Sequence, residues 1–304
     1  ITIRQDRIYI RRELVAIILL VSLCAPTFGQ MTANDWFDQG NALALQGNST
    51  GAISAYDEAL RLDPNHHRAW NNMGFLLEAQ GRYDEALGAF DRAVEIDPQY
   101  TMAWNNRGTA LAAQGRYEEA ILACDKAIEI DPQGAVFWFN KANSLSDLGR
   151  IDEAILAYDR AVELDPQYEA AWYNKGEILA GQGRYDEAAQ AYVEAIKINP
   201  ENKGAWNNIG NVLSVLGRYD EALPAYDVAI RLSPGEADFW HNQGNAFAEL
   251  GKYDQAILAY EKAIELNPQD ADSWHNKGVA LNLLNRTAEA SAALASAEEL
   301  DLKT

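Results

Sequence analysis

The sequence predicts an all-α fold, a superhelical solenoid of helix–turn–helix repeats, and three observations support this prediction. The eight tryptophans recur at a constant interval of 34 residues. Small residues recur at fixed distances from each tryptophan, and seven of the nine prolines share one position of the same period. Self-similarity with a period of about 20 to 50 residues is the signature of repeat architectures. The tryptophans are Trp36, Trp70, Trp104, Trp138, Trp172, Trp206, Trp240 and Trp274.

Setting tryptophan at position 4 places the repeat unit, and we number the positions in each unit as repeat positions 1 to 34. Eight units then run from Ala33 to Thr304, within a predicted solenoid domain of residues 30–304. Terminal repeats need a polar outer face because nothing stacks on them. Thr287 and Glu298 supply polar groups in the last unit, so Thr304 is expected to lie near a natural end of the array. The predicted repeats are 33–66, 67–100, 101–134, 135–168, 169–202, 203–236, 237–270 and 271–304.

The small residues indicate two closely packed helices in each unit. Repeat position 8 is glycine in seven units and Ala142 in the fourth. Glycine inside a helix costs about 1 kcal/mol relative to alanine, so close approach of a second helix is expected there. Repeat positions 20 and 27 are alanine in all eight units and share one helical face. Glycine at repeat position 15, as in Gly81, marks the turn between the helices. Proline after Asp, Asn or Ser, as in Pro98, ends the second helix.

Composition excludes several classes of protein. With 48% hydrophobic and 23% charged residues, the 304-residue chain is neither disordered nor a polytopic membrane protein. Its net charge of −20 repels phosphate backbones, so no nucleic-acid partner is predicted. Two cysteines, Cys24 and Cys124, are too few for a disulfide framework or a four-cysteine metal site.

Residues 1–29 differ from the repeats and are predicted to be a signal peptide or an N-terminal membrane anchor. Four arginines and two acids give this segment a local charge of +2, and an apolar run follows from Leu14 to Ala25. This order is typical of an export signal, and the run is shorter than the roughly 17–25 residues of a spanning helix. The solenoid is therefore expected to be exported, and any membrane contact is expected only through this segment.

The pattern Trp-x-x-x-Gly, Gly-Arg-Tyr-x-Glu-Ala, Ala and Asp-Pro over residues 33–304 resembles the tetratricopeptide repeat (TPR) family. The resemblance implies a right-handed superhelix whose first helices line a concave groove. It also implies a non-enzymatic scaffold that binds an extended peptide or a partner protein. The alternatives are a structural or assembly protein acting through its outer face or by self-association, or the binding arm of a larger enzyme complex.

Repeat position 6 is the main candidate for groove contacts. Asparagine offers donors and an acceptor that match a peptide amide, and the row resembles the asparagine ladder in the TPR superhelix of O-linked N-acetylglucosamine transferases. The alternative is that these amides tie neighbouring helices together. A binding role requires accessible amides at Asn140, Asn174 and Asn208. The position holds Asp38, Asn72, Asn106, Asn140, Asn174, Asn208, Asn242 and Asn276.

Repeat position 5 supplies the remaining groove candidates. TPR co-chaperones hold a C-terminal carboxylate with a clamp that needs lysine here, and no unit has one, so the clamp is absent. The candidates are Asn71, Asn105, Phe139, Tyr173, Asn207, His241 and His275.

Two histidines and two aspartates in the last two units form another candidate cluster. Such side chains can ligate a transition metal, but equivalent atoms of adjacent repeats are about 10 Å apart, roughly a helix diameter. We therefore predict no metal or cofactor and favour an acidic, pH-sensitive patch for a basic ligand. The residues are Asp238, His241, Asp272 and His275.

Packing is expected to explain the other unusual residues. Cys124 is predicted to be a small core residue. Pro224 is expected to bend its helix or delay its start near 219–223. The cations at repeat position 7 are expected to extend to solvent or to pair with carboxylates. They are Arg107, Lys141, Lys175 and Lys277. No catalytic constellation stands out, so no enzymatic activity is predicted.

Overall fold

The computed structural model describes residues 31–302, and these residues fold into α-helices with no strand among them. The first helix of each repeat begins 34 residues after the previous one, and the second helix follows it closely. The first helices are α2 (Ala33–Leu45), α4 (His67–Ala79), α6 (Thr101–Ala113), α8 (Ala135–Asp147), α10 (Glu169–Gly181), α12 (Lys203–Val215), α14 (Ala237–Glu249) and α16 (Ala271–Leu283). The second helices are α3 (Ser49–Leu62), α5 (Tyr83–Ile96), α7 (Tyr117–Ile130), α9 (Ile151–Leu164), α11 (Tyr185–Ile198), α13 (Tyr219–Leu232), α15 (Tyr253–Leu266) and α17 (Thr287–Asp301).

The turn between the paired helices needs a left-handed residue, which explains the glycine at repeat position 15. Gly81 has φ 75° and Gly149 has φ 81°, a region that residues with a Cβ rarely enter. The eighth repeat has Asn285 at this position, with φ 60°. Asparagine tolerates this conformation better than most residues.

Close packing explains the small residues. A Cβ on Gly210 would lie 2.5 Å from Cε1 of Tyr226, which confirms that position 8 lets the second helix approach. Ala222 and Ala229, at repeat positions 20 and 27, are fully buried in the same contact. Cys124 is also fully buried, and burial raises the pKa of its thiol to about 12. It is therefore a core residue, as predicted, rather than a reactive thiol.

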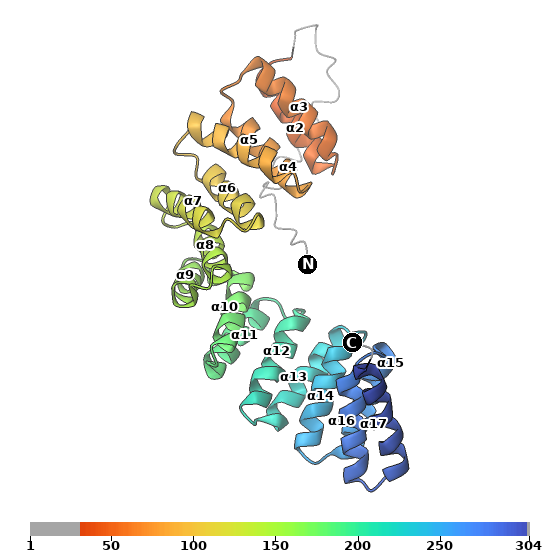
Figure 1. Cartoon of the computed structure of the whole chain (residues 1–304). Helices are drawn as coiled ribbons and strands as arrows, with labels where there is room; N and C mark the ends of the chain where they lie inside the picture. The colour runs from red at the N-terminus through yellow and green to blue at the C-terminus, as the bar shows by residue number, and fades with distance from the viewer. Residues whose placement is uncertain (1–30, 303–304) are drawn as a thin grey trace.

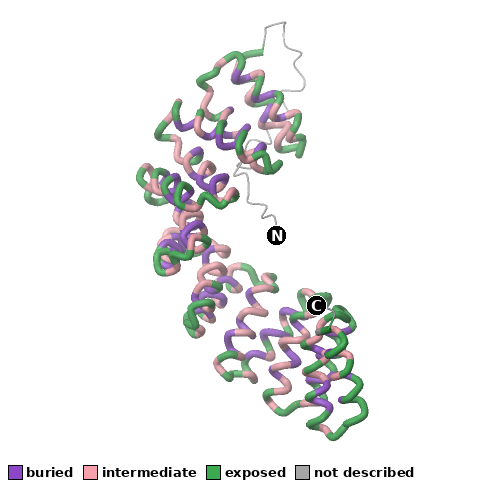
Figure 2. Tube along the Cα trace, viewed as in Figure 1, coloured by how far each residue is buried: buried purple, intermediate pink, exposed green. Residues whose placement is uncertain are grey.

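The array curves with its first helices on the inner side. Neighbouring first helices contact one another, as in α4 with α6 and α12 with α14, whereas no two second helices of the described repeats do so to a similar extent. Figure 1 shows the resulting arc, with α6 and α8 on the inner side of the bend relative to α7 and α9. Buried residues run between the helices along the whole array (Figure 2), as expected for a solenoid without one central core.

The tryptophans are half-buried, and each of seven joins its helix to the loop before it. Trp70 and Trp206 donate from Nε1 to the carbonyl oxygens of Pro64 and Pro200, both at 2.9 Å. The conserved spacing of tryptophan and proline within the period therefore has a direct cause, which the sequence analysis did not find. The same bond occurs in repeats 2 to 8.

Of the two effects expected of Pro224, a bend or a late start of its helix, the late start is wrong. Helix α13 begins at Tyr219, at the repeat position where the second helices of most other repeats begin. The one local difference is an extra bond from the Glu221 N–H to the Arg218 carbonyl at 3.1 Å. Proline is tolerated because it is exposed near the helix start, where the carbonyl that loses its partner can reach water.

None of the helices that the structure describes is both long and apolar enough to span a membrane. The predicted signal peptide or anchor at 1–29 lies outside the described residues, as does Thr304.

Candidate peptide-binding groove

The concave face consists of repeat positions 2, 5, 6, 9, 12 and 13 of the first helices. These positions recur at helical spacing, so they share one side of each helix. The first helices are on the inner side of the curve. All the asparagines predicted at repeat position 6 are therefore brought to one continuous surface.

Each asparagine at repeat position 6 donates one Nδ2–H to the preceding repeat. Asn140 donates to Oδ1 of Asn105 at 2.8 Å, and Asn208 donates to the Tyr173 hydroxyl at 3.2 Å. The alternative that these amides tie neighbouring helices together therefore holds for Nδ2, and the row stabilises the stacking of repeats. The other bonds are Asn72 to Asn41, Asn106 to Asn71, Asn174 to Asn143, Asn242 to Asn207 and Asn276 to Asn245.

Buried tyrosines at repeat position 24 extend this network into the core. Oδ1 of Asn41 accepts from the Tyr56 hydroxyl at 2.8 Å and from Nδ2 of Asn72 at 3.0 Å. Asn245 accepts in the same way from Tyr260 and Asn276. Burial raises the pKa of Tyr56 to about 12, so its hydroxyl stays protonated and able to donate. The preceding repeat thus fixes the orientation of the row.

The hydrogen bonding of the amide oxygen, Oδ1, differs between the two ends of the row. Oδ1 of Asn72 accepts from Asn71 at 3.1 Å, and Oδ1 of Asn106 accepts from Asn105 at 3.5 Å. Further along, the described residues provide no donor for several Oδ1 atoms. Because the Nδ2 of these residues is held by the previous repeat, their Oδ1 is left for an outside donor. These residues are Asn140, Asn208, Asn242 and Asn276.

Three candidates at repeat position 5 do not reach the surface. Asn71, Asn105 and Phe139 are only 5%, 4% and 3% exposed, so their predicted contact with a ligand is corrected. They pack between repeats, where Asn71 and Asn105 accept from the repeat-position-6 asparagine of the following repeat.

The other candidates at repeat position 5 become more accessible toward the C-terminus. Tyr173, Asn207 and His241 are half-buried, and His275 is exposed. Tyr173 accepts from Asn208, and burial is the main reason that its pKa is raised to about 12.

The cations at repeat position 7 are directed away from the concave face. Lys175 pairs with Asp159 of the preceding repeat at 2.5 Å, and its Nζ lies 5.2 Å from the centre of the Trp172 ring. The predicted pairing with carboxylates is confirmed, and a cation–π contact accompanies it. Equivalent pairs are Arg107 with Asp91, Lys141 with Asp125 and Lys277 with Glu261.

The histidine and aspartate cluster of the last two repeats does not converge. His241 Nδ1 lies 2.7 Å from the Ser273 hydroxyl, which donates to Asp270, so the imidazole faces the repeat interface. Within residues 31–302 no three potential ligands gather as a metal site would require. Ser273 is fully buried and donates to the carboxylate rather than to the imidazole, so it lacks the activation that a nucleophile requires.

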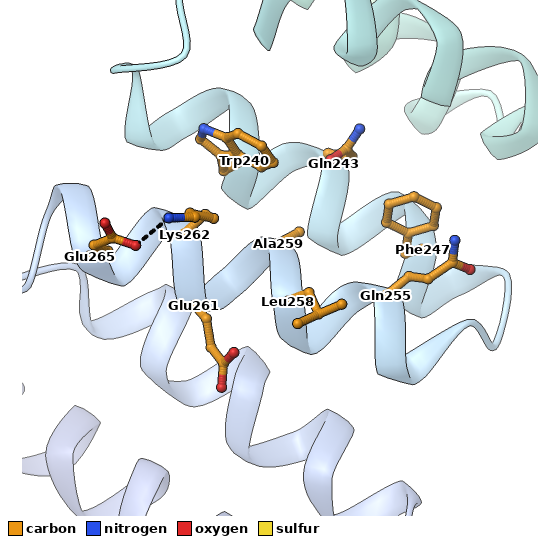
Figure 3. Close-up of a pocket in the computed structure, with 9 residues that line it drawn as sticks. All are labelled: Trp240, Gln243, Phe247, Gln255, Leu258, Ala259, Glu261, Lys262 and Glu265. Carbon is orange, nitrogen blue, oxygen red and sulfur yellow. Dashed lines mark hydrogen bonds and ion pairs between the residues drawn. The ribbon is translucent and has the colours of Figure 1, made fainter.

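The outer surface has hollows of its own. One lies between α14 and α15 and is lined by Trp240, Phe247 and Leu258, with the Lys262–Glu265 pair at its edge (Figure 3). Leucines at repeat position 22 stand exposed on the second helices, with Leu122 at 65% and Leu156 at 68%. These apolar groups are a second surface on which a partner could pack.

Comparison with known proteins establishes the family. A tetratricopeptide repeat model matches residues 37–101, 139–202 and 181–237. Further tetratricopeptide repeat models match residues 102–133, 225–258, 244–285 and 271–304. The chain therefore belongs to the tetratricopeptide repeat family and is an all-α repeat solenoid.

Solved structures show the same fold. A structure described as "YrrB: a TPR protein with an unusual peptide-binding site" is 29% identical, with TM-score 0.54, over 59% of this chain and 92% of that chain. A MamA protein structure is 24% identical, with TM-score 0.51, over 57% and 94% of the respective chains. No curated protein matches the chain in sequence. A protein–protein interaction scaffold is the function that the family supports.

Proposed function

We propose that this interaction scaffold holds an extended peptide segment of a partner protein on its concave face, mainly in repeats 4 to 8. The observation that carries the proposal is the row of Oδ1 atoms at Asn140, Asn208, Asn242 and Asn276, which have no donor among the described residues. Backbone N–H groups of an extended chain are suitable donors for such a row.

Energetics favour a distributed contact. Each neutral hydrogen bond contributes only about 0.5–1.5 kcal/mol net, so several rungs must act together. Because the inter-repeat bonds already fix the amides, little side-chain entropy is lost when a ligand binds. The similarity to YrrB, described as a TPR protein with an unusual peptide-binding site, supports a peptide ligand. The protein is proposed to act by binding rather than by catalysis.

Substitutions that fill the groove test this proposal without removing any hydrogen bond of the asparagine row. Ala180 and Ala248, at repeat position 12, are half-buried on the concave face, and each can be replaced by tyrosine. Ala292→Tyr on the exposed outer side of α17 is the matched control. Peptides selected from a random displayed library on the full chain should lose at least tenfold in affinity with Ala180→Tyr/Ala248→Tyr and keep it with Ala292→Tyr. Unchanged affinity in the groove variant contradicts the proposal.

Self-association through the outer face is the second candidate function. It is favoured by the exposed Leu122, Leu156 and Leu258 and by the apolar hollow beside Leu258. Sedimentation of the full chain separates the two candidates. A mass that rises with concentration, and falls after Leu122→Gln/Leu156→Gln, supports the outer face.

Export is proposed on the sequence of residues 1–29 alone. Cleavage before Gln30 would change the net charge from −20 to −22, because the removed segment carries +2. N-terminal sequencing of the protein recovered from an extracytoplasmic fraction tests this, and an intact terminus indicates an anchor instead.

A further inference from the structure

We propose that the concave face of repeats 4 to 8 selects positively charged, donor-rich segments, that is, extended peptides containing Lys or Arg. This inference rests on the proposed function, because it assigns the ligand chemistry of the same groove. Two independent features carry it: carboxylates without any Lys or Arg on the concave face, and the orientation of the asparagine amides.

Negative charge is distributed along the concave face of these repeats. Five carboxylates occupy repeat positions 2, 9 and 13 there, and no Lys or Arg occupies any concave position of repeats 4 to 8. All five are exposed, and none makes an ion pair with another described residue. They belong to four different repeats, so they form a row rather than a local cluster. The residues are Asp147, Glu177, Asp238, Glu249 and Asp272.

The cations of the same repeats are committed elsewhere. Arg184, which precedes α11, pairs with Glu187 at 2.6 Å, and Lys262 on α15 pairs with Glu265 at 2.5 Å. Every described Lys and Arg in repeats 4 to 8 makes such a pair, with the exception of the exposed Arg231 on α13. The positive charge of these repeats therefore lies away from the concave face and is paired there, whereas the concave face carries carboxylates with no Lys or Arg beside them.

The asparagine row adds acceptors to this negative surface. Donation from Nδ2 to the preceding repeat leaves Oδ1 of Asn140, Asn208, Asn242 and Asn276 as the atom without a donor. Carboxylates and amide oxygens both accept hydrogen bonds. A ligand that satisfies them must offer donors, and Lys and Arg side chains offer donors together with the complementary charge.

Screening of charges by salt provides a way to test this inference. Exposed charges interact over about 8 Å at physiological ionic strength, so a preference that comes from these carboxylates must weaken with salt. Binding through backbone N–H groups and Oδ1 is neutral and should change little. Salt dependence therefore separates this inference from the proposed function on which it rests.

The experiment uses the full chain and three labelled, end-blocked peptides that differ only at every third residue, which is Lys, Gln or Glu. Fluorescence anisotropy at low salt should show the Lys peptide binding about tenfold more tightly than the Gln peptide, with the Glu peptide weakest. Added salt should reduce that ratio. Comparable affinity of the Lys and Gln peptides, each lost in Ala180→Tyr/Ala248→Tyr, overturns the inference and leaves the proposed function standing. Absence of binding by all three overturns both.

Charge-neutralising variants locate the effect. Asp238→Asn/Glu249→Gln/Asp272→Asn should remove most of the preference for the Lys peptide. The matched control, Glu118→Gln/Asp152→Asn/Asp254→Asn, removes the same charge from exposed carboxylates in the first turns of second helices and should retain the preference. An equal loss in both variants means that net charge, not the concave face, attracts the peptide, and this too overturns the inference.

Discussion

The concave face differs between repeats 1–3 and repeats 4–8, although the same repeat positions line both sections. In the first section the Oδ1 atoms of Asn72 and Asn106 are taken by the adjacent Asn71 and Asn105. In the second section four Oδ1 atoms have no donor among the described residues. A residue type at one position therefore does not determine its availability, because its neighbours decide which of its polar atoms are left.

The cause lies at repeat position 5. Asparagine there, as at Asn71, donates to Oδ1 of the next residue and accepts from the following repeat. The Oδ1 of the repeat-position-6 asparagine is then occupied, and we call such a pair a closed rung. Phe139, Tyr173 and His241 occupy the same position in the second section and make no such donation in the described structure. Asn207 accepts from Asn242 without closing its own rung, so position 5 is the main determinant but not the sole one.

The largest effect is expected at Trp172, which lies on α10 within the second section. Trp172 packs against the cores on both of its sides and carries the Lys175 contact. Trp172→Ala should destabilise its neighbourhood by about 3 kcal/mol, the low end for a large aromatic because the ring is half-buried. Since repeats couple mainly to their neighbours, chemical denaturation followed by circular dichroism should resolve into more than one step.

Trp274→Ala is the control for this variant, because it lies in the last repeat and cannot divide the array. A single transition at an unchanged midpoint in Trp172→Ala would contradict the expectation that the repeats on either side of Trp172 unfold separately.

The next effect concerns the carboxylate of the first section. Burial raises the pKa of Glu78 to about 7, and the bond from Thr109 lowers it only in part. Between about pH 4.5 and 7 the native state then binds more protons than the unfolded state, so stability falls as pH rises through that window. In Glu78→Gln the free energy of unfolding should fall by roughly 2 kcal/mol less over this window than in the wild type. The figure follows from about 1.4 kcal/mol per pKa unit, reduced because Glu78 is partly exposed.

Urea unfolding at pH 5 and pH 8 measures that difference. Glu249→Gln, which changes an exposed carboxylate of the second section, should follow the wild type. The same pH dependence in wild type and Glu78→Gln contradicts the expected burial of Glu78.

Opening a closed rung gives a smaller effect and tests the role of repeat position 5. Asn105→Ala leaves Nδ2 of Asn140 without its acceptor and frees Oδ1 of Asn106. Stability should fall by about 1–2 kcal/mol, the usual cost of an unsatisfied buried group, while repeat 3 becomes able to accept from a ligand. Thermal melting measures the loss. Asn282→Ala, an exposed change on the same face, should be neutral, and equal losses in the two variants would argue against the rung.

The smallest effect is expected from giving Asp57, in the first repeat, the cationic partner that Asp91 has in the second. Asp57 occupies the repeat position of Asp91 and Asp159, but Met73 stands where their cationic partners do; burial raises the pKa of Asp57, and Arg82 lowers it only in part. In Met73→Lys, Met73 is a core residue whose packing the lysine stem must replace. The new pair with Asp57 should contribute about 0.5 kcal/mol at pH 7, and this contribution should vanish when Asp57 is protonated at low pH. Ile209→Lys, placed opposite Val193 at the equivalent positions, should instead destabilise. A gain that persists at low pH contradicts the pairing.

The repeat period was sufficient to predict the fold, because tryptophan, glycine and alanine report packing that recurs in every unit. Gly210 against Tyr226 and the burial of Cys124 follow directly from that pattern. The loop bonds of the tryptophans were missed although the constant spacing from proline to tryptophan was a usable signal.

The site could be predicted only in outline. The sequence places Asn140 and Asn174 on the concave face but does not show which oxygen of the preceding repeat each can reach. Asn140 reaches repeat position 5 and Asn174 reaches repeat position 9, a choice that depends on side chains 35 or 31 residues earlier. For the same reason the burial of Asn71 and Asn105 could not be read from their position alone.

Photo-crosslinking tests the central claim most directly, that ligands bind the concave face of repeats 4 to 8. The Lys peptide carrying a central benzophenone would be bound to the full chain, irradiated and mapped by mass spectrometry. Our account predicts adducts on α8, α10, α12, α14 and α16, with few on the second helices or on α2, α4 and α6. Adducts spread evenly over repeats 1–3, or concentrated on the outer leucines of α7, α9 and α15, would contradict it.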